Sequence, residues 1–269
     1  MINNKLAILL IPILIIFALV SFWIYSHRLI LQSKSNLIFA NKKILSLSKS
    51  GNSSITVVFV GDSMTEYLGN FDELRGYLKN YYPEKKFLLL NYGFSSTNIL
   101  SVQERLEKDS THSGRIFQAI NDIPFDLILI ESFGHNPLSQ YSLNDGLKKQ
   151  QEALDKIVET ISKKHRKSSI IFVSTIAPNK DYYGLGAVNL TPEQRQQWVS
   201  ERIAYIKNHI QYANSHNILL INIYEKSLDD KGTGNIDYVS SNDFIHPSPT
   251  GVYFISEQIV KYLYENNRL

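Results

Sequence analysis

The chain has 269 residues, of which 43% are hydrophobic and 20% are charged, the composition of an ordinary globular protein with a sizeable core. It contains no cysteine, which excludes disulfide bonds, thiolate metal sites and a cysteine nucleophile. The net charge of +3 is unevenly distributed, because residues 1–61 hold six basic and no acidic side chains, whereas the other 208 residues hold 22 basic and 25 acidic ones. The basic balance is therefore no argument for nucleic-acid binding, and none is expected.

An uncharged apolar run, LAILLIPILIIFALVSFWIY, covers residues 6–25. A helix of this length rises about 30 Å, which matches the hydrocarbon thickness of a bilayer. Trp23 and Tyr25 stand at its end, where interfacial aromatic residues are common. We therefore predict one transmembrane helix in an N-terminal anchor of residues 1–26, followed by a Ser-, Lys- and Asn-rich stalk of residues 27–54.

The same run has two other interpretations, a cleaved signal peptide and a buried core helix. It is longer than the apolar part of most signal peptides, and Ser26-His27-Arg28 after it does not resemble a small-residue cleavage site. Lys5 precedes the run, whereas Arg28 and Lys34 follow it, so the positive-inside rule would place the domain in the cytoplasm. A short tail with one lysine before a long apolar run is typical of a signal anchor. We therefore expect a single-pass cell-membrane protein with its domain outside the cytoplasm.

Residues 55–269, the expected domain, alternate between apolar runs and helical patterns. The runs, rich in β-branched, leucine and aromatic residues, lie at 55–60, 86–90, 126–130, 169–174 and 218–223. Apolar residues recur at helical spacing within 147–164. Thr191, Pro192 and Gln194 supply an N-cap, a first-turn proline and a capping box for a further helix. Strand and helix alternating in this way predict an α/β fold with a doubly wound, five-stranded parallel sheet.

Polar side chains follow the first apolar run, at the carboxyl end of a strand, where active sites form in open parallel sheets. Gly61, Asp62 and Ser63 stand there, and the glycine permits a sharp turn into a helix. A serine that opens a helix exposes its hydroxyl and keeps its own N–H free, so Ser63 is a candidate nucleophile. The other interpretation is a helix N-cap serine, which is commoner, and the segment lacks the final glycine of the usual hydrolase elbow.

Two further polar loops follow the second and third runs. The amide of Gly93 and the side-chain amide of Asn136 are candidates to bind a developing oxyanion, although glycine and asparagine are also ordinary turn residues. Ser95 lies in the same G-x-S-x-T spacing as Ser63 and is a competing serine. His135 is a reserve candidate for the base.

Asp243 and His246 stand three residues apart in a tight turn before the last predicted helix. This spacing can hold a carboxylate against an imidazole, which fixes the tautomer and stabilises the imidazolium when histidine takes a serine proton. The alternative is a plain surface turn. A metal site is less expected, because no further ligands cluster nearby and no H-E-x-x-H is present. The remaining histidines, which we assign to the stalk or to polar helix surfaces, are His27, His112, His165, His209 and His216.

Together these segments resemble the SGNH (GDSL-like) hydrolase family over about residues 55–265. The four marker residues of that family correspond here, in order, to Ser63, Gly93, Asn136 and His246. The resemblance implies a flavodoxin-like sheet of order 2-1-3-4-5 and a catalytic triad completed by Asp243. It also implies an oxyanion hole made by the first three markers, through the amides of Ser63 and Gly93 and the side chain of Asn136. Such a mechanism requires no metal and no organic cofactor.

The sequence departs from the family pattern at two positions. Pro137 replaces the usual aspartate after Asn136, and Ser96 stands where a second glycine is common. Neither change removes a catalytic atom, but both alter the surroundings of the acyl group. The substrate therefore stays open.

The resemblance and the anchor together predict a membrane-anchored serine esterase or acyl hydrolase acting on an acyl ester of a small molecule or polysaccharide. Removal of O-acetyl groups from envelope polysaccharide and hydrolysis of lipid esters both fit, with bilayer contact through residues 6–25. Two alternatives remain, an O-acyltransferase with the same triad and a non-catalytic, membrane-tethered carbohydrate-binding domain. Tyr182 and Tyr183, in the loop 178–191, would either line the pocket or, as we expect, lie in an unconstrained surface loop. The oligomeric state is not predicted.

Overall fold

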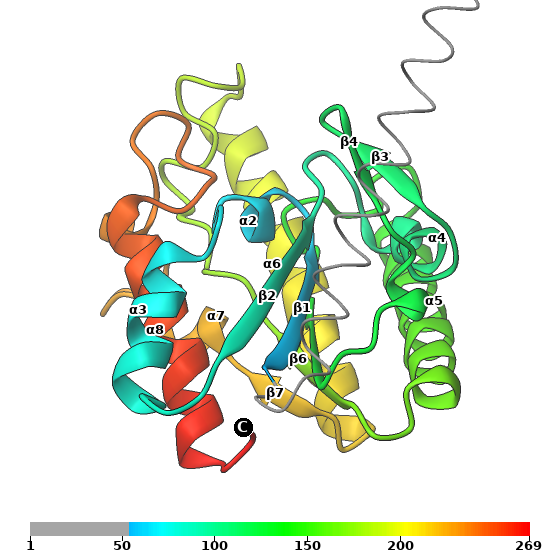
Figure 1. Ribbon diagram of the computed structural model, residues 1–269. Coiled ribbons are helices and arrows are strands. Elements are labelled where there is room, and N and C mark those ends of the chain that lie inside the picture. Colours follow the sequence, from blue (N-terminus) through cyan, green and yellow to red (C-terminus); the bar gives the residue numbers. More distant parts are fainter. Residues whose placement is uncertain (1–53) are drawn as a thin grey trace, which may run out of the picture. The chain divides into compact units, whose positions relative to one another are not determined.

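A five-stranded parallel sheet lies at the centre of residues 54–269, the part of the chain that the computed structural model describes (Figure 1). Its strands are β1 (Ile55–Gly61), β2 (Phe87–Gly93), β5 (Leu127–Glu131), β6 (Ser169–Val173) and β7 (Leu219–Ile221). The order across the sheet is β2-β1-β5-β6-β7, and all neighbouring strands are parallel. Numbered along the chain, this is the order 2-1-3-4-5, so the predicted doubly wound sheet is confirmed.

Helices cover both faces of this sheet (Figure 1). On one face lie α3 (Asp72–Tyr81) and α8 (Pro249–Glu265), and on the other lie α4 (Val102–Glu107), α5 (Leu143–Lys164) and α6 (Pro192–Ser215). Two one-turn helices, α2 (Ser63–Glu66) and α7 (Ile223–Lys226), follow β1 and β7. Single 3-10 turns occupy Ile99–Ser101, Ile120–Asp122 and Ile236–Tyr238.

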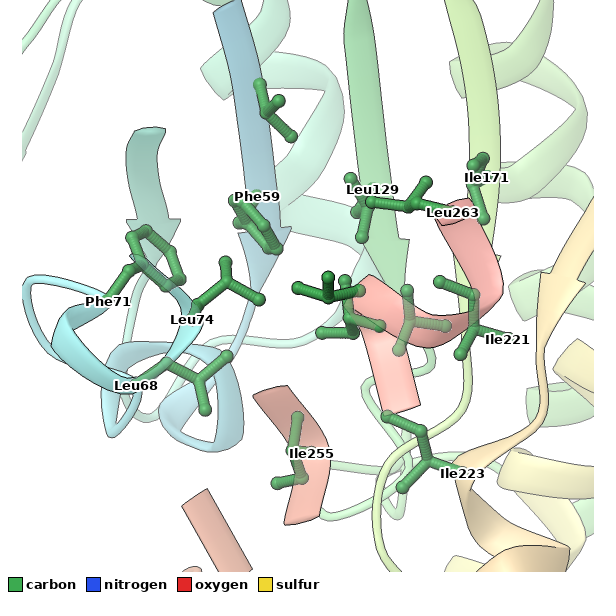
Figure 2. Packing of buried hydrophobic residues seen from close by; sticks show 14 of the residues in the cluster. Phe59, Leu68, Phe71, Leu74, Leu129, Ile171, Ile221, Ile223, Ile255 and Leu263 are labelled. Carbon is green, nitrogen blue, oxygen red and sulfur yellow. The ribbon is translucent and has the colours of Figure 1, made fainter. Parts of the chain in front are cut away.

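The core forms on both faces because successive side chains of a strand point to opposite sides. Phe59 and Leu129 pack with Leu74 of α3 and Leu263 of α8 in the main cluster (Figure 2). Phe172 is also fully buried, but it stacks on aromatic side chains of α6. Burial on both faces explains why the strands read as continuous apolar runs rather than alternating ones.

Helix α6 begins as its sequence predicts. The Thr191 hydroxyl accepts the Gln194 N–H at 3.2 Å, and the Gln194 side-chain oxygen accepts the Thr191 N–H at 2.9 Å. This reciprocal pair satisfies two amides that lack partners inside the helix. Helix α5 begins at Leu143, earlier than the periodic stretch at 147, because Ser142 caps it through the Asp145 N–H at 3.3 Å.

Three elements differ most from the sequence expectation. Strand β2 extends to Gly93, beyond the predicted end at 90. Strand β7 ends at Ile221 rather than 223, because Asn222 caps the next helix and Ile223 is already helical. A short antiparallel hairpin, β3 (Ser110–His112) and β4 (Arg115–Phe117), was not predicted. Its turn residues, Ser113 and Gly114, both have positive φ, at 48° and 73°, as tight hairpin turns require.

The described residues contain no helix that is both long enough and apolar enough to cross a membrane. The apolar run at 6–25 and nearly all of the stalk lie outside the described residues. The anchor, its orientation and the stalk therefore stay predictions.

Candidate active site

The segments that carry the candidate residues follow the carboxyl ends of three adjacent strands. Ser63 follows β1, Gly93 closes β2, and Asn136 lies in the loop after β5. Strands β1 and β2 stay in register up to the pair Gly61–Gly93, so their following loops start side by side. In Figure 1, α2 lies at this end of the sheet.

Ser63 is the first residue of α2 and is 7% exposed. The N-cap is Asp62, whose carboxylate accepts the Met64 N–H at 2.8 Å. The interpretation of Ser63 as an N-cap is therefore wrong, and its hydroxyl is not needed to begin the helix. Its own N–H has no hydrogen-bond partner among the described residues, as expected at a first helical position.

Asp243 and His246 form the predicted pair. Asp243 Oδ2 lies 2.6 Å from His246 Nδ1, while Asp243 Oδ1 accepts the N–H groups of Ile245 and His246 at 2.8 and 3.0 Å. Partial burial raises the pKa of Asp243, but these hydrogen bonds outweigh it, so the pKa lies below its ordinary value. An ionised Asp243 holds the proton on His246 Nδ1 and leaves Nε2 as the basic nitrogen. Phe244, with φ of 52°, makes the tight turn that permits this arrangement.

Tyr67 joins this pair to the helix of the candidate nucleophile. Its ring stacks on the His246 imidazole, with ring centres 4.1 Å apart and planes 1° from parallel. Tyr67 is the C-cap of α2, the one-turn helix that Ser63 begins. The stack therefore brings the serine segment and the histidine turn together, although they lie far apart in sequence. Tyr67 was not among the residues predicted from the sequence.

Gly93 does not offer the free amide that was expected of it. Its N–H donates to the Asn91 side-chain oxygen at 2.8 Å. A Cβ at this position would lie 2.3 Å from the Glu66 backbone nitrogen, so glycine is required for the close approach of β2 to α2. Among the described residues, the amides of Ser96 and Thr97 in this loop have no hydrogen-bond partner, and Ser96, with a φ of 60°, is in the left-handed conformation that glycine adopts readily. A glycine, which is common at this position in the family that the sequence resembles, would adopt this conformation without strain.

Asn136 does reach the serine segment. Its side-chain Nδ2 donates to Asp62 Oδ2 at 2.8 Å, next to Ser63 in the chain. An amide nitrogen has two hydrogens, so one is fixed by Asp62 and the other remains for a ligand. The carboxylate thus orients the amide beside the candidate nucleophile.

A second buried carboxyl group, Glu131 at the end of β5, supports the same turn. Its Oε2 accepts the Asp62 N–H at 3.1 Å, and its Oε1 accepts the Phe133 N–H at 2.8 Å and the Ser132 hydroxyl at 3.0 Å. Burial raises the pKa of Glu131 well above its ordinary value, and the neighbouring Asp62 raises it further. Burial also raises the pKa of Asp62, against the hydrogen bonds from Asn136 and Met64. Of the two carboxyl groups, Glu131 has the more strongly raised pKa.

The two competing candidates are excluded by their surroundings. His135 is buried, with Nδ1 3.1 Å from the Tyr183 hydroxyl and Nε2 3.3 Å from the Ile176 carbonyl oxygen. Burial lowers the pKa of His135 to about 3, so it cannot serve as the reserve base near neutral pH. The Ser95 hydroxyl donates to the Glu66 carboxylate, which occupies it in a structural contact.

Two of the remaining histidines do not lie on polar helix surfaces, contrary to the expectation. His112 lies in β3, stacks on Phe94 with ring centres 4.5 Å apart, and places Nε2 3.2 Å from the Glu66 carboxylate. His209 is fully buried and stacks on Phe172 at 4.3 Å. Burial lowers its pKa to about 3, so it is a neutral core side chain. Among the described residues no group of three or more acidic or histidine side chains could hold a metal ion.

We expected the loop 178–191 to be an unconstrained surface loop, and this prediction is wrong. The Arg195 guanidinium donates to the carbonyl oxygens of Tyr183 and, at 3.3 Å, Leu190. Tyr183 is buried, and its hydroxyl accepts a hydrogen bond from Arg202 at 2.9 Å. Tyr182 is 45% exposed, and its ring stacks on Phe244 with ring centres 5.5 Å apart. The loop thus packs against the turn that carries Asp243 and His246.

No protein-family model and no curated protein matches the sequence. Solved structures do match. A protein described as a lipolytic protein of the G-D-S-L family from Desulfitobacterium hafniense DCB-2 is 18% identical, with a TM-score of 0.52 over 78% of this chain and 100% of its own. The acetyl xylan esterase AlAXEase is 15% identical, with a TM-score of 0.55 over 77% of this chain and 98% of its own. A GDSL-like lipase from Parabacteroides merdae ATCC 43184 is 13% identical, with a TM-score of 0.55 over 80% and 97%. At such identities the likeness shows a shared GDSL-like fold.

Proposed function

We propose that this protein is a serine esterase in which Ser63, His246 and Asp243 form the catalytic triad. The observation that carries the proposal is the bond of 2.6 Å between Asp243 and His246, in a turn whose histidine stacks on the helix that Ser63 begins. Ser63 does not serve as the helix N-cap, because Asp62 caps α2 instead. The Ser63 hydroxyl is therefore available to react with a substrate. The fold shared with GDSL-like lipases and acetyl xylan esterases supports the same conclusion.

In this mechanism His246 Nε2 takes the proton from the Ser63 hydroxyl as its oxygen attacks the ester carbonyl. Asp243 stabilises the imidazolium, which then donates the proton to the departing alcohol. A water molecule, activated by His246 in the same way, cleaves the acyl-enzyme and restores the serine. Metal and organic cofactors have no part in these steps.

The oxyanion of each tetrahedral intermediate would be held by the Ser63 N–H, the Asn136 side-chain amide and the Ser96 N–H. Ser96 replaces Gly93 in this set, because the Gly93 N–H already donates to Asn91. The bond from Asn136 to Asp62 supports this assignment, since it fixes the amide before a substrate arrives. Loss of one donor from such a set costs about 10²- to 10³-fold in rate.

The substrate that we propose is an ester-linked acyl group, such as O-acetyl, on a small molecule or a polysaccharide. Two exposed tyrosines, Tyr67 and Tyr182, flank the catalytic turn by stacking on His246 and Phe244. Exposed aromatic rings of this kind offer an amphipathic surface for the alcohol part of a substrate. With the anchor proposed at residues 6–25, the enzyme would work at the outer surface of the cell membrane.

The test is the hydrolysis of p-nitrophenyl esters, from acetate to long acyl chains, by the full chain in mild detergent. We expect activity that falls to background in Ser63→Ala and stays near wild type in Ser95→Ala, the matched serine in the neighbouring loop. The chain-length profile separates acetyl esters from lipid esters. A folded wild type that is inactive on every ester would contradict the proposal, and acceptor-dependent release of the acyl group would identify an acyltransferase instead.

A further inference from the structure

The side chain of Arg105, in α4, is the most deeply buried guanidinium of the described residues, at 2% exposed. A buried cation is costly unless it is paired or fully hydrogen-bonded. Within the described residues no carboxylate lies in salt-bridge contact with Arg105. Burial lowers its pKa to about 10, and the charges of Asp62 and Glu131 oppose that change, so the guanidinium stays protonated at neutral pH.

Four hydrogen bonds take the place of an ion pair, while Nε has no partner among the described residues. Nη1 donates to the carbonyl oxygens of Gly61 and Tyr92, both at 2.8 Å. Nη2 donates to the hydroxyls of Thr97 and Ser101, at 3.0 and 2.6 Å. A planar guanidinium can meet four acceptors in one geometry, which an ammonium group cannot do.

The two backbone carbonyl groups that Arg105 binds lie at the carboxyl ends of β1 and β2. Gly61 is the last residue of β1, two before Ser63, and Tyr92 is the next to last of β2. The Thr97 bond holds the loop in which Ser96 adopts its left-handed conformation. Nη1 of Arg105 therefore links the ends of β1 and β2, the strands that precede the proposed amide donors Ser63 and Ser96.

The faces of the guanidinium reach a third loop. It lies over the ring of Phe94, 4.6 Å from the ring centre, and 5.4 Å from that of Phe133. Phe133 belongs to the loop after β5 that carries Asn136, and it has a positive φ of 54°. All three loops that supply the proposed oxyanion hole therefore contact one side chain.

We propose that Arg105 is a positioning residue, whose guanidinium holds the loops after β1, β2 and β5 so that the oxyanion-hole donors converge. The inference rests on the proposed esterase function. Arg105 does not itself touch the substrate in this scheme. Its effect is on geometry, where a displacement of about 1 Å can cost about 10²-fold in rate.

The experiment measures p-nitrophenyl acetate hydrolysis by the full chain with Arg105→Lys, Arg105→Met and Arg105→Ala. We expect kcat to fall about 10- to 100-fold with little change in KM, because the donors act on the transition state. Affinity for a boronic acid, which forms a tetrahedral adduct with the serine, should fall by a similar factor. Millimolar guanidinium, but not ammonium, should restore part of the activity of Arg105→Ala.

Asn208→Ala is the matched control. Asn208 is also buried and donates to a backbone carbonyl, that of Leu147 at 3.0 Å, but it lies between α5 and α6. Its loss should lower the melting temperature while leaving kcat and boronate affinity unchanged. Should Arg105→Met fail to fold, Arg105→Lys and the guanidinium rescue carry the test.

Three outcomes would overturn the inference. Folded Arg105 variants with wild-type kcat would do so, and so would a boronate affinity that does not follow the loss of kcat. A wild type without esterase activity would overturn the proposed function and this inference together, whereas the first two results leave the esterase intact.

Discussion

The imidazole of His246 lies parallel to the phenol ring of Tyr67, with the ring centres 4.1 Å apart. The contact joins the two segments that the proposed reaction must bring together, the turn of the base and the helix of the nucleophile. Asp243 fixes one edge of the imidazole through Nδ1, and Tyr67 covers one face. Nε2, which the proposed reaction assigns to the serine, has no hydrogen-bond partner among the described residues.

Replacement of Tyr67 should therefore weaken the placement of the base. We expect Tyr67→Ala to lower kcat/KM about 10-fold, because the imidazole loses a contact that restricts its rotation. Tyr67→Phe keeps the ring and should retain most of the activity. The measurement is kcat/KM for p-nitrophenyl acetate. An equal loss of kcat/KM in both variants would show that the Tyr67 hydroxyl, and not the ring stack, supports activity.

Asp243→Asn should lower kcat by about 10⁴-fold, since an amide can hold the wrong histidine tautomer. Stability provides an independent measurement. The pKa of Asp243 is depressed in the folded state, so its contribution to the free energy of unfolding is present above its ordinary pKa of 3.8 and is lost as the pH falls through the lower, folded-state value. The melting temperatures of wild type and variant should converge as the pH falls below 3.8, where the carboxylate of the wild type takes up a proton. A difference that persists undiminished in strong acid would contradict the assigned role of the carboxylate.

The elements that the sequence predicts are those whose signals are local. Thr191 and Gln194 are three residues apart, so their capping box is visible in the sequence, and helix α6 begins where they predict. The Asp243–His246 pair is equally local, and the two side chains meet as expected. The strands are continuous apolar runs, so all five were located, although their boundaries were less exact, most of all at the end of β2 and the end of β7.

The missed residues act over long separations or look ordinary in the sequence. Arg105 stands in a polar helical stretch, where a charged residue is normally solvated, and only the fold shows that it is buried. Glu131 had a usable signal, because it is an acid at the end of a strand whose other residues are all apolar. The stack of Tyr67 on His246 could not be found from spacing, since it depends on how two distant loops fold.

Two substitutions in the loop after β2 distinguish packing from amide donation. Gly93→Ala would place a methyl group 2.3 Å from the Glu66 nitrogen, so we expect α2 to shift, the protein to lose about 1–3 kcal/mol of stability, and activity to fall. Ser96→Gly keeps the backbone N–H and relieves a left-handed serine, so its activity should stay near wild type. Thermal unfolding and esterase assays of both variants provide the comparison. A Ser96→Gly enzyme without activity would assign a role to the serine side chain rather than to the amide.

The raised pKa of Glu131 has a consequence for the pH dependence of stability. Its pKa in the folded state lies above the ordinary value of 4.5, so the folded protein holds a proton that the unfolded chain releases. The free energy of unfolding should therefore decrease as the pH rises above about 4.5, until the folded-state pKa is passed. Glu131→Gln cannot ionise, and its stability should depend less on pH in that window, although the loss of an acceptor for the Asp62 N–H lowers it overall. Denaturant unfolding from pH 5 to 8 measures both slopes, and parallel slopes would show that Glu131 is already ionised.

The exposed ring of Tyr182 offers a test of the substrate class. It is 45% exposed and stacks on Phe244, in the turn that carries Asp243 and His246, but it forms no hydrogen bond with either of these two side chains. If the alcohol part of the substrate is a sugar, Tyr182→Ala should raise KM for an acetylated oligosaccharide several-fold and leave p-nitrophenyl acetate hydrolysis unchanged, because only the larger substrate reaches the ring. Tyr253→Ala, which removes a ring 54% exposed on α8, is the matched control and should affect neither substrate. An equal effect of Tyr182→Ala on both esters would instead mean that the loop shapes the catalytic turn, and the sugar would then have to be bound elsewhere.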